Sequence, residues 1–157
     1  MNEQPNMIII PPTKKAEKEK KKVIKRKVAA YARVSTSQEE QHTSYVTQVR
    51  HYTKYIQENK DWTFVKVYSD DGITGTSTKH REGFKEMIAD AMSGKIDLII
   101  TKSVSRFARN TIDTLTNVRK LKEQGVEVFF EEQNIHTLDS TGETILTIMS
   151  SLAQEES

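Results

Sequence analysis

The sequence predicts an α/β fold with a mostly parallel central sheet flanked by helices. Short apolar or β-branched segments of strand length alternate along the chain with longer segments whose apolar residues recur at helical spacing. A parallel pair of strands needs a long crossover connection, and the intervening helical segments have the length for one. The 157 residues, 35% of them hydrophobic and 29% charged, suit one globular domain with its own core.

The first half of the chain supplies two strands and one helix. Residues 27–34 (KVAAYARV) are short, apolar and bounded by polar residues, as buried strands are. Residues 38–59 predict a helix because apolar side chains recur at helical spacing, at Tyr45, Val49, Tyr52 and Ile56. Residues 62–70 (WTFVKVYSD) alternate and are rich in β-branched and aromatic residues, which predicts a second strand. Residues 70–83 form a long polar loop, and such loops often carry function.

The second half repeats the alternation. Residues 84–94 predict a helix closed by its last residue, Gly94, and residues 95–102 (KIDLIITK) a third, buried strand. Residues 110–125 predict a helix that ends at a glycine, and residues 126–132 (VEVFFEE) a fourth strand. One face of the helix at 110–125 is expected to carry Ile112, Leu115, Val118 and Leu121.

The last segment, residues 141–157, has a further helical stripe, formed by Ile145, Ile148, Met149 and Leu152. No capping glycine, proline or polar tail closes this pattern before the sequence stops. We therefore expect the chain to be a piece of a longer protein, cut inside a helix. The alternative is a natural terminal helix that frays.

Charge is unevenly distributed. Residues 1–27 hold nine Lys and Arg against three Glu, a net of +6, which leaves −4 for residues 28–157 out of the chain's total of +2. The basic stretch is interpreted as a solvated tail that aids solubility, or as an arm that contacts nucleic-acid phosphates. No cysteine is present, which excludes disulfides and thiolate chemistry, and the apolar runs are far shorter than a membrane span. A cytoplasmic location is expected.

Arginines gather where ligands bind in this fold class. In open α/β sheets the ligand crevice lies beyond the carboxyl ends of the strands. Four of the six arginines in residues 28–157 fall there: Arg33, Arg81, Arg106 and Arg109. The planar guanidinium matches phosphate oxygens with paired hydrogen bonds, and several together stabilise charge developing on a phosphoryl group. This edge of the sheet therefore predicts a phosphate site.

Ser35, two residues after Arg33, is a candidate nucleophile for a phosphodiester, although a hydroxyl needs activation. The simpler interpretation is a helix N-cap, and each arginine taken alone is interpreted as a surface residue. The four histidines are scattered, so no Ser-His-Asp triad is indicated. Asp70 and Asp71 are interpreted as turn residues rather than Mg²⁺ ligands. No phosphate-binding glycine loop is present, so no nucleotide cofactor is expected.

At these residues the chain resembles the serine recombinases, the family of resolvases, invertases and large integrases. Four motifs carry the resemblance in the family's order: YARVS at 31–35, HREGF at 80–84, KSVSRFARN at 102–110 and SLAQEES at 151–157. The resemblance runs from about residue 27 to the end and implies a resolvase-like catalytic domain of a large serine recombinase from a phage or conjugative transposon. It implies three parts: a basic tail at 1–26, a catalytic domain at 27–140, and the start of a long interface helix at 141–157.

The resemblance also implies the chemistry. Ser35 would form a 5′-phosphoserine bond to DNA, and the four arginines would bind the scissile phosphate, with no metal or cofactor. Gln48, Ser105 and Glu156 would support the site; Ser105 stands where small resolvases carry an aspartate, as in the large members. The implied partners are double-stranded DNA and further copies of the chain, as a dimer and then a tetramer. The alternative is a catalytically inactive DNA-binding or regulatory module.

Overall fold

The computed structural model describes residues 24–34, 38–71, 81–108 and 110–156. Within them, side chains are described at 24–33, 44–70, 81–108 and 110–151. The described strands are β1 (Arg26–Val34), β2 (Trp62–Asp71), β3 (Leu98–Thr101), β4 (Glu127–Phe130) and β5 (Ile135–His136). The described helices are α2 (Gln38–Gln57), α3 (Glu82–Met92), α4 (Val104–Phe107), α5 (Thr111–Glu123) and α6 (Ser140–Glu156).

The five strands form one sheet in the order β2-β1-β3-β4-β5. Strand β1 pairs in parallel with β2 and β3, and β3 pairs in parallel with β4. Strand β5 runs antiparallel to β4. The predicted α/β fold with a mostly parallel sheet is confirmed. Helix α4 and strand β5 are not predicted from the sequence, because segments of four and two residues are too short to show a period.

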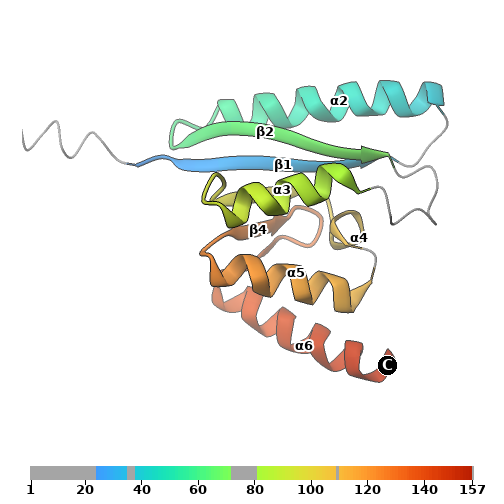
Figure 1. The fold of residues 1–157 in the computed structure, drawn as a ribbon, viewed down its shortest axis with the longest axis vertical. Coiled ribbons are helices and arrows are strands. Elements are labelled where there is room, and N and C mark those ends of the chain that lie inside the picture. Colours follow the sequence, from blue (N-terminus) through green and yellow to red (C-terminus); the bar gives the residue numbers. More distant parts are fainter. Residues whose placement is uncertain (1–23, 35–37, 72–80, 109, 157) are drawn as a thin grey trace, which may run out of the picture.

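Helices cover both faces of the sheet. Helix α2 lies on one face against β1 and β2, and α3 and α5 lie on the other, with α6 packed outside α5 (Figure 1). The predicted helix ends are confirmed, since Gly94 and Gly125 follow α3 and α5 with φ of +87° and +75°, a conformation that favours glycine. None of the described helices is long and apolar enough to cross a membrane.

The larger core lies between the sheet and the helices α3, α5 and α6. Four of its aromatic rings meet edge to face in series: Tyr31 with Phe84, Phe84 with Phe107, and Phe107 with Phe130. Their centroids are 5.3, 5.1 and 5.5 Å apart, a favourable arrangement for aromatic pairs. These rings join β1, α3, α4 and β4, so they fix the backbone from which the expected site residues project.

The smaller core lies under α2 and consists of Val28, Ala30, Tyr52, Ile56, Leu98 and Ile100. Two of the four residues predicted on the buried face of α2, Tyr52 and Ile56, belong to it. Tyr45 is 41% exposed and Val49 is half-buried, so the amino-terminal half of this face is less covered than the pattern predicts.

Two predicted helix faces are partly wrong. Ile112 is 50% exposed while Leu115, Val118 and Leu121 are buried. Ile112 and Leu121 are nine residues apart, and at about 100° per residue they point to opposite sides of a helix. In α6, Ile148 is 52% exposed, whereas the neighbouring Leu146 is buried. The buried face of α6 therefore includes Leu146 in place of Ile148, while Ile145 and Met149 of the predicted stripe pack against the core.

Candidate active site

Three of the four predicted arginines lie at the carboxyl edge of the sheet. Arg33 is near the end of β1, Arg81 directly precedes α3, and Arg106 lies in α4. Ser35 and Arg109 lie outside the described residues. Glu156 is the last residue of α6, and its side chain is outside the described part.

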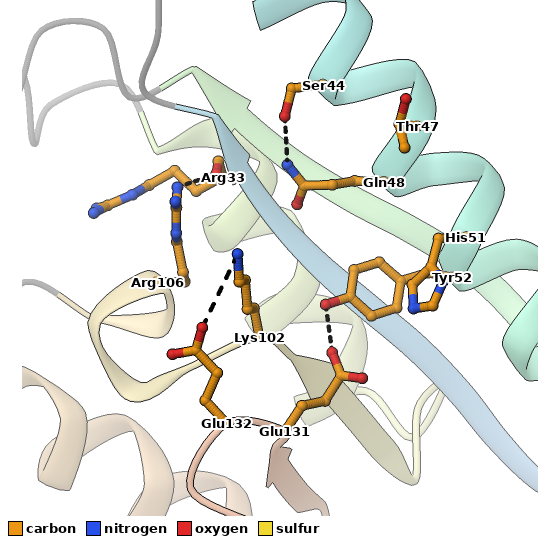
Figure 2. Close-up of a pocket in the computed structure, with 10 residues that line it drawn as sticks. All are labelled: Arg33, Ser44, Thr47, Gln48, His51, Tyr52, Lys102, Arg106, Glu131 and Glu132. Atoms are coloured by element: carbon orange, nitrogen blue, oxygen red, sulfur yellow. Dashed lines mark hydrogen bonds and ion pairs between the residues drawn. The ribbon is translucent and has the colours of Figure 1, made fainter.

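Arg33 and Arg106 contact each other's chain segments. Arg106 Nη1 donates a hydrogen bond to the main-chain oxygen of Arg33 at 2.6 Å (Figure 2). Arg33 Nη2 donates to the main-chain oxygen of Ser105 at 3.3 Å. The two bonds join the end of β1 to α4. Arg33 Nε is buried and has no hydrogen-bond partner among the described residues. A buried donor without a partner is costly, so this Nε is a candidate donor to a ligand oxyanion.

Arg81 is the most enclosed of the three arginines, at 8% exposed. Its guanidinium lies 3.9 Å from the ring centroid of Phe84 and donates through Nη2 to the main-chain oxygen of Phe107 and, at 3.3 Å, to the Tyr31 hydroxyl. Nη1 lies 3.6 Å from Asp113 Oδ2. Arg81 thus holds the carboxyl end of α4, where Phe107 directly follows Arg106.

The interpretation of Asp70 as a turn residue is wrong. Its carboxylate accepts hydrogen bonds from the main-chain nitrogens of Gly83 at 2.7 Å and Phe84 at 2.8 Å, and so caps the start of α3. It also accepts from the Tyr31 hydroxyl at 2.7 Å. Burial, followed by this hydrogen bond, raises the pKa of Tyr31 above its ordinary value. A side chain at Gly83 would place Cβ 2.1 Å from the Ser69 oxygen, so only glycine fits there.

A cleft of about 560 Å³ opens beside Arg33 and Arg106, between α2 and the ends of β3 and β4. It is lined by Arg33, Ser44, Thr47, Gln48, His51, Tyr52, Lys102, Arg106, Glu131 and Glu132 (Figure 2). Gln48 lines this cleft and donates to the Ser44 hydroxyl at 3.2 Å. The predicted supporting residue Ser105 is exposed and shares a 3.0 Å hydrogen bond with Ser103.

Several of the residues that line the cleft were not identified from the sequence. Lys102 and Glu131 follow β3 and β4, so the rule that ligands bind at the carboxyl ends of strands would have found them. Tyr52 was assigned to the core or helix surface; it is 3% exposed, yet its hydroxyl donates to Glu131 Oε1 at 2.6 Å. The cleft is mixed in charge, since Lys102 faces Glu132 at 4.0 Å. Its cationic end, at Arg33 and Arg106, suits a phosphate group.

Comparisons with solved structures agree with this fold. The chain is similar to the N-terminal catalytic domain of TP901-1 integrase, with a TM-score of 0.69 and 26% identity, over 83% of this chain and 96% of that one. It is also similar to a resolvase family site-specific recombinase from Streptococcus pneumoniae, with a TM-score of 0.68 and 31% identity, over 84% and 88% of the two chains.

Comparisons of sequence identify the family. The chain is 32% identical over 131 residues to the Tn3 resolvase of Escherichia coli and 36% identical over 94 residues to the Tn552 resolvase of Staphylococcus aureus. The first alignment covers 83% of this chain and 63% of the Tn3 resolvase, and the second covers 58% and 45%. The family model for the resolvase N-terminal domain matches residues 28–157. The chain therefore belongs to the resolvase family of serine recombinases, through that N-terminal domain.

Proposed function

We propose that this chain is the catalytic part of a site-specific DNA recombinase that cleaves and exchanges DNA strands through a covalent 5′-phosphoserine intermediate. The observation that carries the proposal is the pair Arg33 and Arg106, which line one cleft and each donate a hydrogen bond to a main-chain oxygen of the other's chain segment. Ser35 follows Arg33 by two residues in the sequence. Membership of the resolvase family supports it. Positive charge near a hydroxyl is the arrangement that transfer of a phosphoryl group to that hydroxyl needs.

In the proposed reaction, Ser35 Oγ attacks the phosphorus of a DNA phosphodiester. A bond forms between Oγ and phosphorus, and the bond between phosphorus and the 3′ oxygen breaks. The serine loses its proton and the departing 3′ oxygen gains one, so the number of protons is unchanged. The phosphodiester is conserved as a phosphoserine ester, which the 3′ hydroxyl of another strand attacks to reseal the DNA. The reaction requires no metal or cofactor.

The four arginines have different roles in the proposed reaction. Arg33, Arg106 and Arg109 bind the scissile phosphate and stabilise the charge that develops on its oxygens. Arg33 Nε, which has no hydrogen-bond partner among the residues that the structure describes, is a donor suited to a phosphate oxygen. Arg81 contributes positive charge from a more buried position and holds α4 in place through Phe107.

Three further residues and the domain division complete the proposal. Gln48, Ser105 and Glu156 support the site. Residues 27–140 form the catalytic domain, residues 141–157 begin an interface helix, and residues 1–26 are a basic tail. The partners are double-stranded DNA and other copies of the chain, one dimer at each site and two dimers in the strand-exchange complex. The reaction takes place in the cytoplasm.

A gel assay tests this proposal. The full-length protein and its Ser35→Ala variant are incubated with DNA that carries the junctions flanking its own gene, in EDTA, and run under denaturing conditions. We expect a protein adduct on the 5′ end with the unaltered protein and none with the variant. If both proteins bind the junctions and neither forms the adduct, while an active relative does so in parallel, the catalytic assignment is wrong and a regulatory DNA-binding module takes its place.

A further inference from the structure

We propose that Tyr52 and Glu131 are positioning residues for this reaction: their contact holds helix α2, with Gln48, at a fixed distance from α4, with Arg106. The inference rests on the proposed function, because it assigns these residues to the same cleft. Neither residue lies in a motif that carries the family resemblance. Both line the cleft together with Arg33 and Arg106 (Figure 2).

The Tyr52–Glu131 contact is short, and its tyrosine is buried. The Tyr52 hydroxyl donates to Glu131 Oε1 at 2.6 Å, and Tyr52 is 3% exposed. Hydrogen bonds to an ionised carboxylate at this distance are about twice as strong as neutral ones. The two residues are 79 apart in the sequence, so the bond joins parts of the fold that no local structure connects.

The Tyr52–Glu131 hydrogen bond connects α2 to the opposite wall of the cleft. Helix α2 packs against β1 and β2, while Glu131 follows β4, which is two strands away from β1 in the sheet. Among the described side chains of α2, the other hydrogen bond is the one between Gln48 and Ser44, which stays within the helix. Among the described side chains of α2, Tyr52 is therefore the one that is hydrogen-bonded to the opposite wall of the cleft.

On the opposite side, Glu131 is rigidly connected to α4. Its main-chain nitrogen donates to the Thr101 oxygen at 3.0 Å, and the Glu132 nitrogen donates to the Lys102 oxygen at 2.8 Å. Thr101 ends β3, and α4 begins at Val104. A displacement of Glu131 is thus transmitted through a few residues to Arg106.

The charges near this contact keep the Tyr52 hydroxyl a donor. Burial, then the hydrogen bond to Glu131, raises the pKa of Tyr52 well above its ordinary value, whereas the Arg106 charge acts in the opposite direction. Glu131 in turn has its carboxylate oxygen occupied by Tyr52. If the hydroxyl is removed, that carboxylate is left without its donor in a cleft where the Arg106 charge is close enough to act, and Arg106 is drawn away from a bound phosphate.

The test is a double-mutant cycle on the full-length protein with Tyr52→Phe, Glu131→Ala and the double variant. The measurements are the rate of covalent adduct formation at saturating DNA and, separately, the affinity for DNA. We expect each single variant to slow adduct formation about ten- to a hundredfold at unchanged affinity, since small misplacements cost that much. The double variant should be no slower than the slower single variant, and Glu131→Gln should restore part of the rate because its amide oxygen still accepts.

Matched controls separate positioning from simple loss of stability. Tyr55→Phe removes a hydroxyl from an exposed tyrosine of the same helix, and Glu123→Ala removes an exposed carboxylate at the end of α5. Both should keep the full rate. The positioning role is overturned if the rate of adduct formation falls only in proportion to the melting temperature of each variant. It is also overturned if the rate losses of the two single variants multiply in the double variant, or if the single variants are as fast as the unaltered protein.

Failure of the proposed function and failure of the positioning role give different results. If the unaltered protein forms no adduct, the proposed function is wrong and the positioning role falls with it. If the unaltered protein forms the adduct and the Tyr52 and Glu131 variants form it equally fast, only the positioning role is wrong. Exchange of the Tyr52 hydroxyl proton with water, followed by NMR, checks the contact without any activity: Glu131→Ala should speed this exchange, and an unchanged exchange rate contradicts the contact.

Discussion

Arg106 and Arg33 are joined through main-chain oxygens as well as by proximity: Arg106 bonds the oxygen of Arg33, and Arg33 bonds the oxygen of Ser105, the residue before Arg106. Each guanidinium thereby fixes the backbone that carries the other. Both groups keep further N–H donors for a ligand, because a guanidinium has five. The pair is therefore oriented without a ligand, as the proposed electrostatic stabilisation of a transition state requires.

Replacement of Arg106 by lysine should strongly slow adduct formation and only modestly lower the free energy of unfolding. Lysine keeps the charge and loses the planar fork, so we expect a rate at saturating DNA lower by about a hundredfold or more. The free energy of unfolding should fall by about 1–2 kcal/mol, from the bond to the Arg33 oxygen. Arg119→Lys, at an exposed position on α5, is the matched control. Equal rates for the two lysine variants would contradict a specific role for the Arg106 fork.

Replacement of Arg81 by methionine should weaken the fold directly. Arg81 is buried, and its loss leaves the Phe107 oxygen, the Tyr31 hydroxyl and the Asp113 carboxylate with fewer partners. We expect the free energy of unfolding to fall by about 2–4 kcal/mol, measured by urea denaturation. A loss of activity with unchanged stability would mean instead that Arg81 acts on the substrate alone.

Replacement of Asp70 by asparagine should loosen the start of α3. An amide presents one oxygen where the carboxylate accepts from Gly83, Phe84 and Tyr31, so at least one of these donors loses a good acceptor. The expected loss in the free energy of unfolding is about 1–2 kcal/mol. Slower hydrogen exchange at the amides of Gly83 and Phe84 in the variant would be the opposite of the expected result.

Alkaline pH should destabilise the fold through buried tyrosines. Burial first, and then hydrogen bonds to carboxylates, raise the pKa values of three tyrosines above the ordinary value of 10.0: Tyr31, Tyr52 and Tyr68. Above pH 10 these groups ionise in the unfolded chain and stay protonated in the folded one. The unfolded state then binds fewer protons, so the free energy of unfolding falls as pH rises, by up to about 1.4 kcal/mol per pH unit for each tyrosine.

Urea denaturation at a series of pH values above 10 measures this slope. Tyr52→Phe should make the fall with pH less steep, because one group that titrates differently in the two states is removed. Tyr55→Phe, at an exposed tyrosine, should change the slope less. Identical slopes for the two variants would show that the Tyr52 hydroxyl ionises as readily in the folded state as in the unfolded one.

The order of the other strands and helices was predictable from the sequence because their segments show a strand or helix pattern, whereas α4 and β5 are too short to show one. Arg33 and Arg106 could be expected at one edge, since parallel strands end on the same side of a sheet. Ile112 was misjudged because repeated steps of three residues drift around a helix, so that Ile112 lies on the side opposite Leu121. In α6, Ile148 is exposed and Leu146, outside the predicted stripe, is buried.

The contacts that complete the site could not be predicted. Asp70 caps a helix that starts 12 residues later in the chain, and this depends on how β2 packs against α3. Tyr52 has the spacing of an ordinary core residue, and its bond to Glu131 depends on a side chain 79 residues away. Such contacts are set by tertiary packing, which local sequence patterns do not encode.

Peptide mapping of the trapped adduct tests the central claim most directly. The covalent complex formed by the full-length protein is digested with protease and nuclease, and mass spectrometry locates the residue that carries the nucleotide through its 5′ phosphate. We expect the modification on Ser35 within the YARVS segment at 31–35. A nucleotide on any other residue, or an unmodified Ser35 peptide in a purified adduct, would contradict the assignment of Ser35 as the nucleophile.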